Sequence, residues 1–297
     1  MNAKNLQLIL CMGGFVLEMG AVAATATQLS DQTAQTLVAT DNAKKLSNGK
    51  NPASTRKGKQ SRKKLKQNEP ILITIDGGSA TKKSPIAKSL AEKFNLIYVE
   101  SGAIYRTIAH VLLKHNLEPR PENKQKIEDF LKNVPWKVVI KNRYACFIVD
   151  NEILSDKELR SESLNATVAL YASQFESVHD FGLKIARKAL DYIRTDGFDG
   201  IIAEGRTCGT KTFPEADLKF WFSASAKAKI DFRLGEEKEV DDPLKRDELD
   251  KASPFAPLTE PEGAIHIWTH SRSLADNIHL ISAFVEQKID EKTNLLN

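Results

Sequence analysis

Short apolar runs and helical patterns alternate along the chain from residue 71 onward. The strand-like runs are rich in Ile, Val, Leu and Phe and comprise residues 71–75, 96–99, 199–203, 217–222 and 264–268. Between them apolar residues recur every three or four positions, as in residues 84–94, where Ile86 and Leu90 share one face. Strands that alternate with helices are typical of a parallel sheet covered on both sides. The pattern therefore predicts an α/β fold with a five-stranded parallel sheet flanked by helices.

One segment breaks this alternation. Residues 136–140 and 145–149 are two apolar runs separated by the polar sequence Lys-Asn-Arg-Tyr. Two such runs joined by a short polar link predict an antiparallel hairpin. We expect the hairpin to belong to a small subdomain inserted at about residues 120–170 of a main domain that spans residues 70–292.

The first 69 residues differ from this domain in composition. Residues 25–69 are rich in Ser, Thr, Asn, Gln and Lys, and such a segment cannot bury enough apolar surface to offset its ordering entropy. We therefore expect residues 1–69 to be a disordered basic leader. Residues 6–24 contain an apolar run that ends in small residues, as a secretory signal does, but Glu18 interrupts it. The run is too short for a transmembrane helix, and no membrane association is expected.

The net charge of the chain arises in the leader. The formal charge is +4, and residues 1–70 contain 11 Lys and Arg against 4 Asp and Glu, whereas residues 71–297 contain 32 against 35. Residues 56–66 hold 7 basic side chains in 11 positions. Such a run is either a solvated linker or a segment that attracts nucleic acid or anionic lipid. Nucleic-acid binding is therefore considered only for residues 56–66.

The three cysteines carry no recognisable metal or disulfide pattern. Cys11, Cys146 and Cys208 lack the spacing of metal ligands and form no even-numbered framework. This indicates a reducing compartment, and we interpret the cysteines as packing residues.

The clearest chemical signal follows the first apolar run. In phosphate-binding loops, backbone N–H groups surround the anion, a Lys reaches the β- and γ-phosphates, and a Ser or Thr hydroxyl holds Mg²⁺. Lys83 and Ser84 fit these roles between a predicted strand and a predicted helix, whereas Lys82 stands where the motif requires Gly. The candidate phosphate-binding residues are Gly77, Gly78, Ser79, Ala80, Thr81, Lys82, Lys83 and Ser84.

Four segments carry further patterns in a fixed order. Residues 73–84 resemble I-x-I-D-G-P-S-G-S-G-K-S, and residues 98–106 are similar to Y-L-D-[ST]-G-A-M-Y-R. Residues 204–216 resemble D-G-R-D-x-G-T-x-x-F-P-D-A, and residues 246–258 resemble R-D-x-x-D-x-x-R-x-x-[SA]-P-L. These are the patterns of cytidylate kinases of the bacterial type, which the chain resembles over most of residues 70–290.

The resemblance implies a P-loop NTPase fold with an inserted nucleoside-monophosphate-binding subdomain. It implies ATP over residues 77–84, Mg²⁺ at Ser84, and CMP or dCMP between the sheet and the inserted subdomain. The reaction would be in-line transfer of the γ-phosphoryl of ATP to the acceptor phosphate, with the protein providing position and charge. Catalytic roles would fall on Lys83, Arg206 and Arg233. The implied substrate-binding residues are Ser101, Arg106, Arg187, Arg206, Arg246 and Asp250.

Several positions depart from the family pattern. In the loop, Lys82 replaces Gly, and Pro85 replaces Thr and has no N–H to offer a phosphate. On the acceptor side, His179 and Ser253 replace arginines and Thr207 replaces an aspartate. A hydrogen bond to a charged group contributes roughly 1.5–3 kcal/mol, so losing two arginine contacts would weaken CMP handling by roughly 10² to 10⁴ fold.

The region between Arg233 and Arg246 is also shorter than in the family and keeps Arg233 as its obvious charge donor. Two functions are compatible with these features. The first is an ATP-dependent CMP or dCMP kinase of reduced activity, which the retained Lys83 and Arg206 favour. The second is a catalytically inactive relative that binds a nucleotide or a protein partner, which the replaced positions favour. We place the kinase first because the architecture serves that reaction.

ATP and CMP are cytoplasmic or organellar solutes, so we expect a cytoplasmic protein. Organelle import or export through the N-terminal segment is the alternative. We expect a monomer.

Overall fold

The computed structural model describes residues 70–159, 161–234 and 242–294. All of them belong to one of the two units into which the chain divides, residues 56–297. The predictions made for residues 1–69, including nucleic-acid binding by residues 56–66, lie outside the described residues and stay predictions. Among the described helices, none combines the length and apolar character that crossing a bilayer requires.

The apolar runs of the sequence form strands that share one sheet. The strands are β1 (Ile71–Gly77), β2 (Leu96–Glu100), β3 (Trp136–Lys141), β4 (Tyr144–Val149), β5 (Gly200–Gly205), β6 (Leu218–Ser223) and β7 (Ile265–Trp268). Within the described ranges the sheet has seven strands in the order β3-β4-β2-β5-β1-β6-β7. The five strands from β2 to β7 in this order run parallel, which confirms the predicted parallel core.

The hairpin accounts for the difference between five predicted strands and seven observed. Strands β3 and β4 pair antiparallel across a two-residue turn, in which Asn142 and Arg143 have left-handed φ values of 49° and 71°. This is the backbone that right-twisted hairpins favour. Strand β4 then joins the edge of β2 in parallel through the pair Tyr98 and Tyr144. The hairpin thus extends the main sheet, whereas the sequence pattern assigned it to a separate inserted subdomain.

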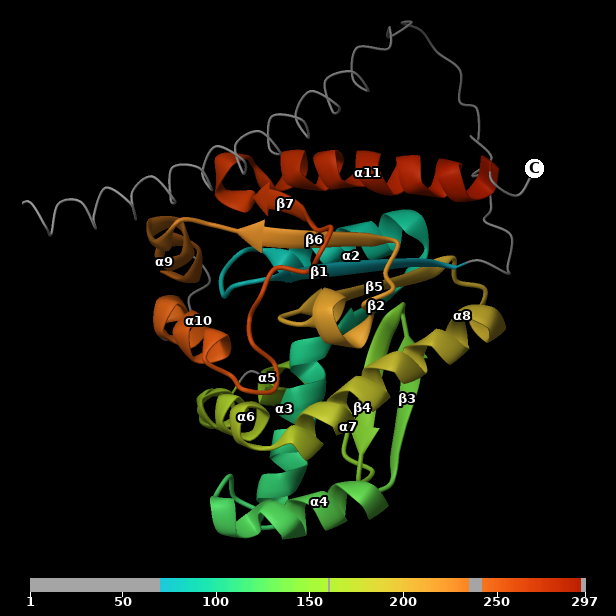
Figure 1. Cartoon of the computed structure of the whole chain (residues 1–297). Coiled ribbons are helices and arrows are strands. Elements are labelled where there is room, and N and C mark those ends of the chain that lie inside the picture. Colours follow the sequence, from blue (N-terminus) through green and yellow to red (C-terminus); the bar gives the residue numbers. More distant parts are fainter. Residues whose placement is uncertain (1–69, 160, 235–241, 295–297) are drawn as a thin grey trace, which may run out of the picture. The chain divides into compact units, whose positions relative to one another are not determined.

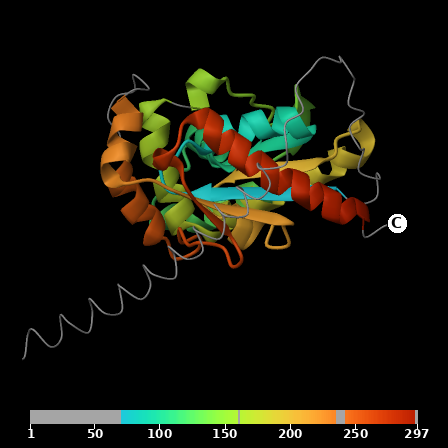
Figure 2. The ribbon, with the colours of Figure 1, turned by 90° about the horizontal axis from the view of Figure 1, so that it is seen from above.

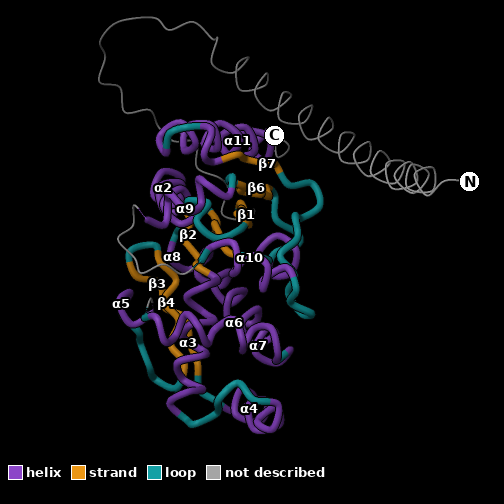
Figure 3. Tube along the Cα trace, turned by 90° about the vertical axis from the view of Figure 1, so that its left-hand side faces the viewer, coloured by secondary structure: helices purple, strands orange, loops and turns teal. Residues whose placement is uncertain are grey.

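Helices cover both faces of the sheet (Figure 1). They are α2 (Lys83–Phe94), α3 (Ser101–Lys114), α4 (Lys124–Asn133), α5 (Asp156–Leu159), α6 (Glu162–Gln174), α7 (Glu176–Arg187), α8 (Asp191–Asp196), α9 (Ala226–Leu234), α10 (Pro243–Lys251) and α11 (Leu274–Asn294). Figure 2 shows α11 crossing over the strands, and Figure 3 shows α4 at the end of the domain opposite α11. A π-helical turn, η3 (Cys208–Thr212), follows β5.

Two apolar cores sandwich the sheet because successive side chains of a strand point to opposite faces. On β5, Ile202 is fully buried in the core shared with α2 and α11. Its neighbours Ile201 and Ala203 belong to the core on the α3, α6 and α7 side. The strand register also aligns the carboxyl ends of the central strands, pairing Asp76 with Gly205 and Glu100 with Glu204. Ligands of open α/β sheets bind at this edge.

Candidate active site

A cleft of about 760 Å³ opens at the carboxyl ends of β1, β2 and β5. The loop after β1 and the start of α3 form one wall, and residues of α6 and α10 form another. Most of the residues predicted from the sequence meet there. The predicted residues that line the cleft are Ser79, Ala80, Thr81, Lys82, Lys83, Ser84, Ser101, Arg106, Arg206, Arg233, Arg246 and Asp250.

The loop between β1 and α2 depends on its first glycine. Gly77 has a φ of 149°, and a Cβ there would lie 2.2 Å from the carbonyl oxygen of Phe222 on the neighbouring strand. Only glycine fits such a close backbone approach. The loop ends at Lys82, and α2 begins at Lys83. Pro85 is the third residue of α2, where a missing N–H does not break the helix.

Lys82 stands in an unfavourable backbone conformation. Its φ of 58° and ψ of 27° are left-handed, and its ammonium lies 3.8 Å from the ring centroid of Phe232. A left-handed non-glycine residue costs roughly 1–2 kcal/mol, whereas an exposed cation–π contact contributes roughly 0.5–1 kcal/mol. The side chain therefore offsets only part of the strain that the missing glycine introduces.

The strain can be measured with two variants. We expect Lys82→Gly to unfold with a free energy within about 1 kcal/mol of the wild type, because relieved strain, lost cation–π contact and added chain entropy nearly cancel. Lys82→Ala loses the contact and keeps the strain, so it should be less stable than Lys82→Gly by about 1 kcal/mol. Chemical denaturation of both variants tests this. An alanine variant as stable as the glycine variant would contradict the strain.

Lys83 folds back over its own loop. Its ammonium donates to the carbonyl oxygens of Gly77 at 2.9 Å and Gly78 at 2.7 Å. Burial and the neighbouring Arg206 guanidinium lower the pKa of Lys83 to about 8, although acidic neighbours such as Glu204 oppose the shift. An anion that entered the loop would favour the charged ammonium.

Ser84 and Glu204 place two oxygen atoms together beside the loop. The Ser84 hydroxyl donates to Glu204 Oε1 at 2.7 Å, and the Tyr98 hydroxyl donates to the same oxygen at 3.0 Å. Within the described part of the chain, no three His, Cys, Asp or Glu side chains form a metal cage. Mg²⁺ usually needs only one or two carboxylates together with substrate phosphates. Ser84 and Glu204 therefore fit as its protein ligands.

Arg206 connects the loop to helix α10. One terminal nitrogen donates to the carbonyl oxygen of Gly77 at 2.8 Å, and the other donates to the Ser79 hydroxyl at 2.8 Å. Its Nε lies 2.6 Å from Asp250 Oδ2. The guanidinium is thus held between the phosphate loop and the opposite wall of the cleft.

The remaining predicted side chains complete the cleft. Ser101 is nearly buried at the start of α3, and Arg106, one turn further along, lies 3.4 Å from Glu100. Arg233 on α9 and Arg246 on α10 line the cleft from the other side. Several cations therefore surround one space, which suits a ligand that carries phosphates.

Arg187 is absent from the described lining of this cleft. It donates to the carbonyl oxygen of Thr212 at 2.5 Å and to Glu215 at 2.7 Å, and its guanidinium lies 5.5 Å from the centroid of Phe213. These contacts tie α7 to the end of η3 and to the segment after it. Its predicted role in substrate binding stays a prediction.

Three positions at which the family pattern has a charged residue line the same cleft as neutral groups, namely His179, Thr207 and Ser253. His179 is 4% exposed, and its Nδ1 lies 2.8 Å from the Tyr105 hydroxyl. Burial lowers its pKa despite the opposing charge of Asp180, so the imidazole is neutral at pH 7. Thr207 is buried, and the Ser253 hydroxyl accepts from the Ala256 N–H at 3.2 Å.

Asp76 and Asp247, like Glu204, had no role assigned from the sequence, although all three lie in the segments quoted above. Asp76 is fully buried and accepts from the N–H groups of Cys208 at 2.7 Å and Gly209 at 2.6 Å. Asp247 on α10 accepts from the Ser79 N–H. Their positions in the D-G and R-D pairs are the signal that could have drawn attention to them.

The central parallel strand, the loop that ends in Lys83 and Ser84, and the basic cleft define a P-loop protein of the nucleotide-kinase class. The chain belongs to the cytidylate kinase family, whose model matches residues 73–287. Members of this family are phosphotransferases.

Individual relatives agree with this assignment. The cytidylate kinase of Chlamydia caviae is 32% identical over 228 residues, which cover 74% of this chain and 100% of that protein. The cytidylate kinase of Clostridium tetani is 30% identical and covers 74% and 95% of the two chains. A bifunctional pantoate ligase/cytidylate kinase of Prochlorococcus marinus is 29% identical, and the match covers 46% of its length.

Proposed function

We propose that the chain phosphorylates CMP or dCMP with ATP as the donor and Mg²⁺ as the cofactor, as a nucleoside monophosphate kinase of reduced activity. The observation that carries the proposal is the meeting of the phosphate loop with Arg106, Arg206 and Arg246 in one cleft. The relatives named as cytidylate kinases support CMP as the acceptor. Because both substrates are cytoplasmic solutes, we also propose a cytoplasmic protein.

The donor side uses the loop and the first residues of α2. The loop N–H groups hold the donor phosphates, and the Lys83 ammonium moves from the carbonyl oxygens of Gly77 and Gly78 to the transferring phosphoryl. Ser84 and Glu204 would hold Mg²⁺, which would supply positive charge against the negative charge that develops during transfer.

The acceptor side uses the arginines of the opposite wall. Arg106 and Arg246 hold the acceptor phosphate, while Arg206 spans both sides through its contacts with Ser79 and Asp250. Arg233 adds charge at the transferring group. A guanidinium grips phosphate with two parallel hydrogen bonds, so these residues align donor and acceptor as well as neutralise them.

A second function is favoured by the replaced positions. His179, Thr207 and Ser253 all line the cleft, and none supplies the charge that the family pattern places there. A protein that binds a nucleotide or a protein partner without turnover would tolerate these changes, because binding depends less on alignment than catalysis does. We propose this inactive form as the alternative.

The two functions differ in one measurement. The purified full-length chain is incubated with Mg-ATP and CMP, dCMP or UMP, and ADP release is followed. Acceptor-dependent ADP supports the kinase, and the preferred acceptor shows whether pyrimidine selection survives at the replaced positions. Folded protein that binds ATP but releases no acceptor-dependent ADP would exclude the kinase and support the catalytically inactive alternative.

The pKa of Lys83 predicts a pH dependence of ATP affinity. Only the ammonium form serves a phosphate, and in the free protein its pKa is about 8. Above that value each pH unit should weaken ATP binding by roughly tenfold, since the proton must be regained on binding. The guanidinium of Lys83→Arg stays charged up to about pH 12, so the ATP affinity of this variant should change little between pH 7 and 9.5. Equal slopes for both proteins, measured by calorimetry from pH 7 to 9.5, would contradict the assignment.

A further inference from the structure

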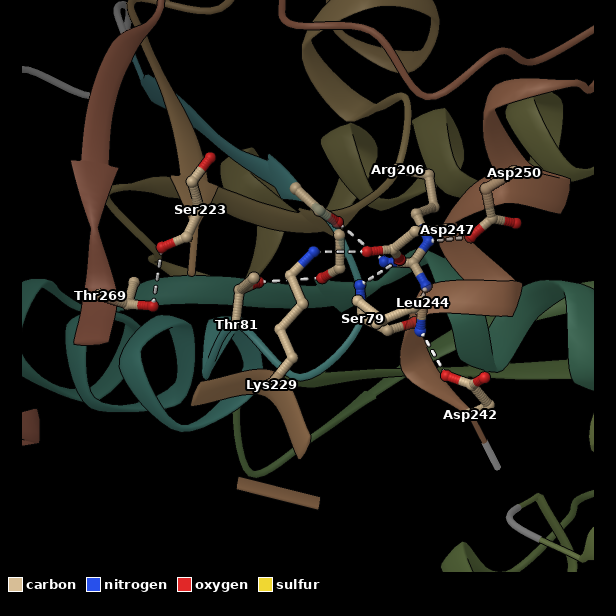
Figure 4. Close-up of polar contacts among 12 residues, drawn as sticks. Ser79, Thr81, Arg206, Ser223, Lys229, Asp242, Leu244, Asp247, Asp250 and Thr269 are labelled. Carbon is tan, nitrogen blue, oxygen red and sulfur yellow. Dashed lines mark hydrogen bonds and ion pairs between the residues drawn. The ribbon is translucent and has the colours of Figure 1, made fainter. Parts of the chain in front are cut away.

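A carboxylate of the protein occupies the phosphate loop. The Ser79 N–H donates to Asp247 Oδ1 at 2.6 Å, and the Lys229 ammonium donates to Asp247 Oδ2 at 2.6 Å (Figure 4). Asp247 comes from α10 and Lys229 from α9, so neither belongs to the loop. The contact spans 168 residues of sequence.

The loop is shaped around this pair of side chains. A Cβ on Gly78 would lie 2.4 Å from Asp247 Oδ2 and 2.8 Å from the Lys229 ammonium. Because Gly78 has no side chain, the carboxylate and the ammonium can meet in the space that a Cβ at this position would fill. Asp247 is 5% exposed, so its carboxylate is held inside the site rather than resting on the surface.

The charge of Asp247 matches that of the expected ligand. Burial opposes ionisation, but the Lys229 ammonium and the Ser79 N–H outweigh it and lower the pKa of Asp247. The group is thus an anion at neutral pH. It uses a loop N–H and an ammonium, which are the two kinds of donor that a phosphate needs at the start of a helix.

We propose that Asp247 is an internal competitor for the phosphate loop, which ATP must displace before its phosphates reach the Ser79 N–H. Displacement frees Lys229, which then contacts the incoming phosphate in place of Asp247. The inference deepens the proposed function, because it rests on phosphate binding by this loop. It assigns Lys229 and Asp247 to the control of donor binding, and the substitutions at Lys82 and Pro85 play no part in it.

Binding of inorganic triphosphate without Mg²⁺ tests this directly, since the probe reports on the loop and requires no acceptor. Calorimetry on the full-length chain compares the wild type with Asp247→Asn and Asp247→Ala. The asparagine carboxamide still accepts from Ser79, so its gain in affinity should be the smaller one. Removing the competitor in Asp247→Ala should tighten binding by about tenfold or more. Glu248→Gln removes one charge from an exposed neighbour on α10 and should change little.

The possible outcomes distinguish a failure of the competitor role of Asp247 from a failure of the proposed kinase function. Equal affinity of the wild type and Asp247→Ala for triphosphate would overturn the competitor role of Asp247, whereas phosphate binding by the loop would stand. Equal gains from asparagine and alanine would also overturn it, because they would indicate charge acting through space. If none of the proteins binds triphosphate, both the competitor role of Asp247 and phosphate binding by the loop are overturned.

If Asp247→Ala does not fold, the backbone amide of Ser79 supplies a second measurement. Its proton resonance in the ligand-free wild type should lie at the low field typical of a bond to a carboxylate, and it should move upfield in Asp247→Asn. The same resonance should shift when triphosphate is added to the wild type. A Ser79 resonance that is unchanged in Asp247→Asn would overturn the proposal.

Discussion

Lys83→Ala should lower kcat/KM for phosphoryl transfer by about 10³ fold or more, the range for a cation that neutralises a transferring phosphoryl. In the ligand-free protein the ammonium rests on the carbonyl oxygens of Gly77 and Gly78, within reach of any anion that enters the loop. Alanine removes the charge together with these two hydrogen bonds. Steady-state ADP release at saturating CMP measures the effect.

A matched control lies on the same helix. Lys93 is exposed and pairs with Glu286 on the surface, so Lys93→Ala should change kcat/KM by less than about twofold. Thermal unfolding of both variants shows whether the fold is kept. Activity of Lys83→Ala within tenfold of the wild type would remove Lys83 from the reaction.

Asp76→Ala should lower the free energy of unfolding by about 3–5 kcal/mol, because it leaves two buried N–H groups without an acceptor and each such group costs about 1–3 kcal/mol. The carboxylate is fully buried and accepts from the N–H groups of Cys208 and Gly209 at the start of η3. Burial raises its pKa, although both N–H groups and the Lys83 ammonium oppose the shift. At about 2–4 °C per kcal/mol, the melting temperature should fall by about 10 °C.

Asp76→Asn is the matched variant for this prediction. Its carboxamide oxygen can accept from one of the two N–H groups, so its loss of stability should be clearly smaller than that of alanine. Because η3 begins two residues after Arg206, we also expect both variants to lose activity as this arginine shifts. An alanine variant that melts within 2 °C of the wild type would show that these hydrogen bonds contribute little.

Local patterns were sufficient to predict the parallel core and the loop. The apolar run at residues 71–75, the glycine turn and the face of Ile86 and Leu90 each depend on neighbours in sequence. The sites of Arg106, Arg206 and Asp250 followed from motif order. The joining of the hairpin to the sheet did not, since it depends on the single pairing of Tyr98 with Tyr144.

Contacts over long sequence distances explain what the sequence could not predict in the site. The bonds from Asp76 to Cys208 and from Asp247 to Ser79 cross 132 and 168 residues. The D-G and R-D pairs mark these two carboxylates as part of the motifs, but nothing in the local sequence indicates which N–H groups they bind. For Arg187, by contrast, the resemblance implied substrate binding, but this residue and its partner Glu215 are both absent from the described lining of the cleft.

The altered loop and the replaced acceptor positions have different consequences. Lys82 adds strain to the loop, but the loop keeps Lys83 and Ser84 at the start of α2. His179 instead places a neutral imidazole where the family pattern has an arginine, on the side of the cleft that we propose for the acceptor. We therefore expect donor binding to be better preserved than acceptor selection.

Phosphorus NMR of the full-length chain with Mg-ATP and CMP is the most direct test of whether this chain is a CMP kinase, because it identifies the product. CDP and ADP should appear together in equal amounts, and Lys83→Ala should form neither in the time that the wild type needs to reach equilibrium. Folded protein that binds ATP yet yields no CDP, or yields ADP and free phosphate without CDP, would contradict the proposed kinase function.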